Sequence, residues 1–175
     1  MNLDQIPSGE SVFVDAAIFV YHFAGASLQC RTFLERSETG DVKATTSCAA
    51  LAEVSHRLMM MEAVSRGLLS AGNVAKRLRN KPSIVKKLHV YDENVQQIPL
   101  MRVEVRPLEL KTLMSASALR AEYGLMVNDS IMVATALSMG VGIIATADRD
   151  FRRVSELSVA VPGDLQTSQS NQTPG

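Results

Sequence analysis

The sequence predicts an α/β fold in which helices cover both faces of a central parallel sheet. Short segments of strand type recur along the chain, and segments of helical periodicity separate each one from the next. Connections of this kind cross from one strand to a parallel neighbour with right-handed geometry. The first strand, predicted over residues 11–15, has apolar residues on both faces, which is typical of a central strand.

The elements of the first half follow from their boundary residues. A helix is predicted to follow the first strand as far as Phe23, and a second helix runs from its N-cap Ser27 to Gly40. Residues 41–45 are short and alternating, and we predict that they form the second strand. The long helix after it starts at Cys48, and its apolar stripe should face the core.

The second half begins with a polar helical segment, residues 65–99, which we expect to be an insertion. Strand patterns then return at residues 102–105, 141–145 and 157–161, the last at the sheet edge. One of the helices between them ends at Gly124, and the next begins at its N-cap Asn128. The prediction is therefore one domain over residues 1–161, followed by a disordered polar tail, residues 162–175.

Composition excludes several classes of protein. The 175 residues carry a formal net charge of zero, so the charge of the whole molecule indicates neither a nucleic-acid surface nor a membrane surface. No apolar run approaches about 18 residues, and the N-terminal residues lack the apolar centre of a signal peptide. Cys30 and Cys48 lack ligand-type spacing, so we expect reduced thiols in a cytoplasmic protein.

Four acids recur at similar places in the predicted fold. Asp15 ends the first strand and Glu53 lies in the second turn of the helix after the second strand. Asp129 opens a helix, and Asp148 follows the fourth strand. Strand ends and helix starts lie on one edge of a parallel sheet, where such sheets bind ligands, so these side chains can converge. Converging carboxylates repel one another unless a divalent cation lies among them, and oxygen-only ligation suits Mg²⁺ or Mn²⁺.

Each acid also has a structural interpretation. Asp129 can cap its helix, Asp148 can form a turn and Glu53 can lie in solvent. Asp15 has no local capping role, however, and the sequence offers no Lys or Arg beside it as a partner. The chain also lacks the phosphate-binding glycine motifs of P-loop and dinucleotide proteins, and it shows no serine or cysteine nucleophile motif. The joint pattern therefore favours a metal site.

A basic segment lies inside the predicted insertion. It carries six cations and no acid: Lys76, Arg77, Arg79, Lys81, Lys86 and Lys87. Two interpretations fit this pattern: a solvated helix-loop-helix face, and a surface that follows nucleic-acid phosphates. Aromatic residues between the charges would favour nucleic acid, but there are none. The sequence leaves both interpretations open.

Three blocks of sequence occur in a diagnostic order: VDAAIFVYHF, TTSCAALAEVSHRLM and VNDSIMVATALSMGVGIIATADRDF. They resemble successive motifs of the PIN domain family, as in VapC-like toxin ribonucleases, over about residues 11–161. The resemblance implies a three-layer α/β/α sandwich with sheet order 3-2-1-4-5. It places the metal-binding and catalytic acids at Asp15, Glu53, Asp129 and Asp148, with Thr146 and Asp150 in supporting roles. The chain departs from the family at Ala17, where many relatives carry Asn.

The resemblance also implies an activity, namely hydrolysis of RNA phosphodiester bonds by an endoribonuclease that uses Mg²⁺ or Mn²⁺. A lone small domain favours the toxin of a toxin-antitoxin pair, with RNA as substrate, an antitoxin as protein partner and a homodimer as the assembly. Two alternatives remain, because fold alone does not decide function. One is a PIN fold that binds RNA or a partner without cutting, and the other is a nuclease of housekeeping RNA processing.

Overall fold

The computed structural model describes residues 1–165, and its centre is a sheet of five parallel strands. The strands lie in the order β3-β2-β1-β4-β5, which confirms the predicted fold and sheet order. Their bounds are β1 Ser11–Val14, β2 Lys43–Ser47, β3 Glu104–Arg106, β4 Ile143–Ala145 and β5 Ser158–Ala160. Val12, Phe13 and Val14 have no exposed surface, and this apolar run explains why β1 takes the central position.

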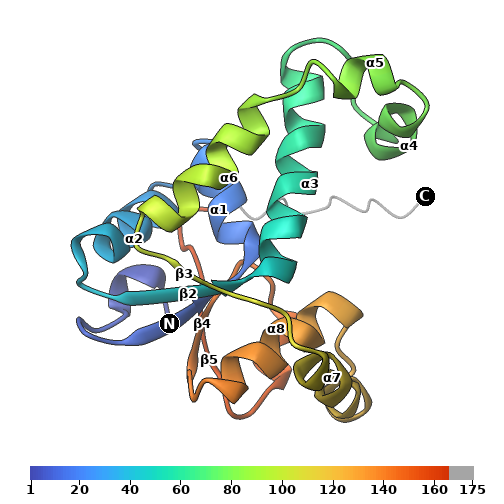
Figure 1. The fold of residues 1–175 in the computed structure, drawn as a ribbon. Coiled ribbons are helices and arrows are strands. Elements are labelled where there is room, and N and C mark those ends of the chain that lie inside the picture. Colours follow the sequence, from blue (N-terminus) through green and yellow to red (C-terminus); the bar gives the residue numbers. More distant parts are fainter. Residues whose placement is uncertain (166–175) are drawn as a thin grey trace, which may run out of the picture.

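Helices form the two outer layers (Figure 1). One face is covered by α1 Ala16–Phe23, α2 Leu28–Thr39, α3 Cys48–Ser65 and α6 Val90–Leu100, and the other by α7 Leu110–Tyr123 and α8 Val127–Ser138. Two 3-10 helices are η1 Leu3–Gln5 and η2 Asp150–Arg153. Ser27 caps α2 as predicted, because its Oγ accepts a hydrogen bond from the Cys30 N–H at 3.0 Å. Gly40, in the left-handed conformation (φ 82°), ends the same helix.

Several strand boundaries differ from the prediction. The second strand was predicted over residues 41–45 but begins two residues later, because Asp41 lies in the turn after α2 and accepts a hydrogen bond from Arg36. β3 begins after Arg102, whose left-handed φ of 57° is incompatible with a strand. β4 begins after Val141, which donates a hydrogen bond back to the end of α8. β5 is one residue shorter at each end.

The prediction that Asn128 is the N-cap of α8 is wrong. The helix begins at Val127, and the Ser130 N–H donates to the carbonyl of Met126 at 2.9 Å. Met126 is therefore the N-cap residue, and its side chain makes no capping hydrogen bond, while Asn128 is exposed in the first turn. Asp129 remains in that first turn, where the helix dipole favours an anion.

A helical arm, defined as residues 67–88, extends from the end of α3 that lies away from the sheet (Figure 1). It carries two short helices, α4 Val74–Arg79 and α5 Pro82–Val85. Leu69, Leu78 and Leu88 of the arm pack with Ala63 of α3 in a hydrophobic cluster separate from the main core. Helices this short are unstable alone, so the arm depends on this cluster for its shape.

The chain after β5 was predicted to be disordered from residue 162. Asp164 nevertheless contacts the start of α2, since its carboxylate accepts hydrogen bonds from Ser27 Oγ (2.6 Å) and from the Gln29 N–H (3.0 Å). The rest of that prediction concerns residues 166–175, which lie outside the described residues.

Cys30 is a buried free thiol and Cys48 an exposed one. Within residues 1–165, no helix combines the length and the apolar character that crossing a membrane requires.

Candidate active site

The four predicted acids line one small pocket at the carboxyl edge of the sheet. The pocket has a volume of about 230 Å³, and the structure brings into it Asp15, Glu53, Asp129 and Asp148. Each acid comes from a different place in the chain: the end of β1, the second turn of α3, the first turn of α8 and the loop after β4. We call this site the acid pocket.

Asp15 is fixed by Thr146, a residue 131 positions away in the sequence. The parallel pairing of β1 with β4 sets Val14 beside Ala145, so the residues that follow them are neighbours. The Thr146 hydroxyl donates to Asp15 Oδ2 at 2.6 Å, and the Asp15 N–H donates to the Ala145 carbonyl at 3.0 Å. Thr146 has no exposed surface, so its hydroxyl holds the carboxylate in a defined orientation.

Thr146 also connects Asp15 to the loop after β4. The Asp148 N–H donates to Thr146 Oγ1 at 3.0 Å, and Asp148 Oδ1 accepts from the Asp150 N–H at 2.8 Å. The Asp150 carboxylate is paired with Arg153 at 2.9 Å and does not line the acid pocket. Asp150 therefore contributes its backbone to the position of Asp148, while its side chain lies outside the pocket.

The electrostatics of the acid pocket favour a bound cation. Asp15 is 6% exposed, and burial raises its pKa to about 6, against the lowering effect of the Thr146 hydrogen bond, while the charge of Glu53 raises it further. The pKa of Asp129 is also raised, first by burial and then by the charges of Asp148 and Glu53. Carboxylates in such an arrangement repel one another, and a divalent ion would relieve the repulsion.

Arg57 is a site residue that the sequence analysis missed. Its guanidinium lines the acid pocket, lies 3.6 Å from Glu53 Oε1 and lowers the pKa of Asp15, although burial of that carboxyl has the larger, opposite effect. Arg57 is paired with Glu53 and acts on Asp15 only through its charge. Glu53 and Arg57 are four residues apart on a helix, a spacing at which opposite charges meet, so the sequence did contain a signal.

Ala17 also lines the acid pocket, two residues after Asp15. The position where the resemblance implies Asn is therefore part of the wall of the acid pocket. Ala offers no side-chain donor or acceptor, so this position adds no polar group to the pocket.

The donor set fits a hard cation that keeps part of its water. Within residues 1–165, no three acidic, histidine or cysteine side chains are close enough to enclose an ion directly. Mg²⁺ dehydrates reluctantly and commonly binds one or two carboxylates while retaining several waters. The carboxylates of the acid pocket offer only oxygen donors, so they match that requirement better than they match the zinc preference for nitrogen and sulfur.

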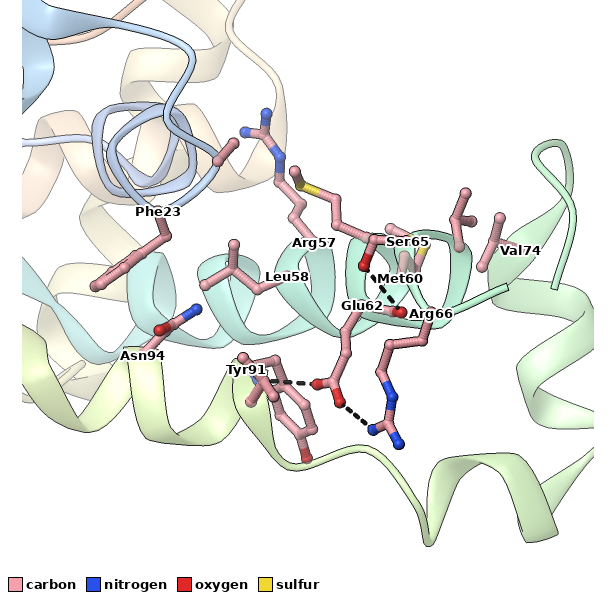
Figure 2. Close-up of a pocket in the computed structure, with 14 residues that line it drawn as sticks. Phe23, Arg57, Leu58, Met60, Glu62, Ser65, Arg66, Val74, Tyr91 and Asn94 are labelled. Carbon is pink, nitrogen blue, oxygen red and sulfur yellow. Dashed lines mark hydrogen bonds and ion pairs between the residues drawn. The ribbon is translucent and has the colours of Figure 1, made fainter. Parts of the chain in front are cut away.

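A second and larger pocket lies beside the acid pocket, with a volume of about 950 Å³ (Figure 2). Its walls are mainly apolar side chains of α1, α3 and α6, among them Phe23, Leu58 and Tyr91. Arg57 lines both pockets, so the larger one reaches the edge of the acid pocket. None of the six basic residues of the arm lines either pocket.

Three solved structures illustrate which proteins have a fold similar to that of this chain. VapBC2 from Rickettsia felis, solved with a DNA fragment from its promoter, has a chain 18% identical to this one, with a TM-score of 0.57 over 86% of this chain and 98% of that one. A toxin-antitoxin complex from Klebsiella pneumoniae is 19% identical, with a TM-score of 0.51 over 86% and 97%. VapC20 from Mycobacterium tuberculosis, described as a Sarcin-Ricin loop cleaving toxin, is 15% identical, with a TM-score of 0.54 over 82% and 95%.

The comparison with curated proteins gave no match. The comparison with protein families matched the PIN domain over residues 12–157, which is most of the chain and includes all four acids of the pocket. The sheet order agrees with that match. The chain therefore belongs to the PIN domain family.

Proposed function

We propose that this protein is an endoribonuclease that hydrolyses RNA phosphodiester bonds with Mg²⁺ or Mn²⁺, and that it is the toxin of a toxin-antitoxin pair. The observation that supports this most strongly is the convergence of four carboxylates, from four separate elements, in one pocket around the buried Asp15. Membership of the PIN family supports the same proposal.

Asp15, Glu53, Asp129 and Asp148 would hold the ion, one or two of them directly and the others through its water molecules. When bound, the ion would lower the pKa of an attacking water and neutralise charge that develops on the phosphate. Thr146 orients Asp15 through its 2.6 Å hydrogen bond, and it keeps Asp148 at the pocket through the Asp148 N–H. Arg57 offsets part of the negative charge beside Glu53.

The test is RNA cleavage by four single variants: Asp15→Asn, Glu53→Gln, Asp129→Asn and Asp148→Asn. Each should cleave about a hundredfold more slowly or worse, because losing a ligand weakens a metal effect worth several kcal/mol. Asp150→Asn should have a smaller effect, since its side chain lies outside the acid pocket. The measurement is single-turnover cleavage of RNA at saturating Mn²⁺.

Asp92→Asn is the matched control, because Asp92 is an exposed acid on α6 that does not line the acid pocket. Wild-type rates in two or more of the four variants would contradict the proposal. A wild-type protein that binds RNA but never cuts it would favour the alternative of a binding protein, which Ala17 supports by removing a polar group from the site.

The proposed protein partner is an antitoxin. The structure from Klebsiella pneumoniae is a toxin-antitoxin complex by its description, and a chain of it shares this fold. The larger pocket supplies an apolar surface that reaches the acid pocket at Arg57, so an antitoxin segment bound there would block access to the acids.

The proposed homodimer is supported by an exposed apolar stripe on α7: Leu110, Leu113 and Met114.

A further inference from the structure

The basic segment keeps five of its six cations in solvent. None of these five forms an ion pair with the described residues, and all are exposed: Lys76, Arg79, Lys81, Lys86 and Lys87. The sequence also contains no acid between Glu62 and Asp92. The arm therefore carries a local excess of positive charge in a chain whose formal net charge is zero.

Arg77 is different from the other five. It is half-buried, and its guanidinium donates hydrogen bonds to Ser70 Oγ (2.7 Å) and to the carbonyl of Ala71 (3.4 Å), both within the arm. Arg77 therefore stabilises the fold of the arm, and the hypothesis that it contacts a phosphate does not fit its position.

A buried acid attaches both ends of the arm to α3 (Figure 2). Glu62 is 7% exposed, and its carboxylate accepts hydrogen bonds from Arg66 Nη1 (2.7 Å) and from the N–H groups of His89 (3.2 Å) and Tyr91 (2.9 Å). Burial acts to raise the pKa of Glu62, but the hydrogen bonds from Tyr91, Arg66 and His89 outweigh it and lower the pKa. The carboxylate stays charged, so the attachment persists at neutral pH.

The arm is thus a preorganised surface. Its cations stand on a framework held by the Leu69, Leu78 and Leu88 cluster at its centre and by Glu62 at its base. Groups positioned before binding lose less conformational entropy when a ligand arrives. α3 carries Glu53 at the acid pocket and Glu62 at the arm, about 14 Å apart along the helix axis, so one rigid element separates the two surfaces.

We propose that the exposed cations of the arm bind the phosphate backbone of RNA and hold the substrate at a second surface, outside the acid pocket. This inference rests on the proposed function, which supplies RNA as the polymer. Long cationic side chains without aromatic neighbours suit contacts to phosphates that do not depend on base sequence. A protein partner would need apolar contacts at the centre of its interface, but the leucines of the arm face its own cluster.

The test measures RNA binding separately from cleavage. The probe is a fluorescent single-stranded RNA of about 12 nucleotides in EDTA, and its anisotropy is titrated at a series of KCl concentrations. The variant is Lys76→Gln/Arg79→Gln, and its matched control is Lys43→Gln/Lys111→Gln, which removes two exposed cations outside the arm that also form no ion pair with the described residues. If both arm residues contact phosphates, the slope of log affinity against log salt should fall by about 1.4, a roughly 25-fold weaker affinity at 0.1 M salt.

A second arm variant, Lys86→Gln/Lys87→Gln, should lower the slope in the same way, which excludes a local folding defect in α4 as the cause. The inference is overturned if both arm variants keep the wild-type slope, or if the control lowers it equally. It is also overturned if the arm variants keep RNA affinity and lose binding to a poly-glutamate peptide, since the surface would then bind an acidic protein.

Cleavage of RNA in Mn²⁺ is measured on the same proteins. Arm-dependent binding without any cleavage by the wild type would contradict the proposed nuclease and leave this inference intact.

Discussion

Asp15 is the residue on which the acid pocket is built. It follows Val12, Phe13 and Val14, which have no exposed surface; it is itself 6% exposed, and its carboxylate accepts a hydrogen bond from the Thr146 hydroxyl at 2.6 Å. Its position therefore follows from the pairing of β1 with β4, while its raised pKa of about 6 follows from burial. Without a bound ion, the buried charge of Asp15 therefore destabilises the folded protein only above the pH at which the carboxyl ionises.

Asp15→Asn should remove a pH dependence of stability. The folded carboxyl has a pKa of about 6 against an ordinary value of 3.8, so the folded state binds a proton more tightly than the unfolded state does. The free energy of unfolding should therefore fall by about 3 kcal/mol as pH rises from about 4 to about 6. The side-chain amide of the variant does not titrate. Its free energy of unfolding should therefore change less with pH and should be higher than that of the wild type at neutral pH. Urea unfolding in EDTA across this range measures both, and equal profiles for the two proteins would refute the assignment.

At the scale of elements, α3 connects the chemistry to the rest of the molecule. Its second turn places Glu53 and Arg57 in the acid pocket, and its far end holds the arm through Glu62. The larger apolar pocket lies along the same helix, lined by Leu58 and Met61. A single long helix therefore fixes the relative positions of Glu53, the proposed antitoxin surface and the basic arm.

The apolar stripe on α7 should mediate a homodimer. Leu110 and Met114 are 74% and 66% exposed and lie four residues apart, on one side of the helix. Leu110→Glu/Met114→Glu should convert the dimer into a monomer, because charge in an apolar interface is costly. Analytical ultracentrifugation measures this result. Leu28→Glu is the control, since Leu28 is 70% exposed on α2 and should leave the dimer intact. A wild-type monomer would contradict the prediction.

At the scale of the whole molecule, Mn²⁺ or Mg²⁺ should stabilise the fold. A ligand that binds only the folded state at about a hundredfold excess over its Kd contributes about 2.7 kcal/mol, which raises the melting temperature of a domain of this size by about 5 to 10 °C. The acid pocket exists only in the folded chain, because its four acids come from distant segments. Differential scanning fluorimetry with and without the ion measures the shift, which should vanish in Asp15→Asn and persist in Asp92→Asn. An equal shift in Asp15→Asn would show that the ion binds elsewhere.

Local patterns in the sequence were sufficient for the order of the elements and for the four acids. The apolar run before Asp15 identifies a central strand, and Ser27 and Gly40 mark the two ends of α2, because strands and helix caps depend on neighbouring residues. Strand starts at β2 and β3 were less accurate, since the pairing register and the backbone at Arg102 decide them. Asn128 failed as a cap because the helix begins two residues earlier, with Met126 as its N-cap.

The sequence by itself determined the family, the sheet and the identity of the acids, because these depend on residue types in a fixed order. Only the tertiary structure decided how side chains from distant positions meet. Thr146 reaches Asp15 across 131 residues, and Glu62 accepts the Tyr91 N–H across 29. The same holds for Arg77, which looks like its five basic neighbours in the sequence but donates its hydrogen bonds within the arm. Periodicity and composition describe a chain locally, whereas burial and hydrogen bonding between distant segments depend on how the layers pack.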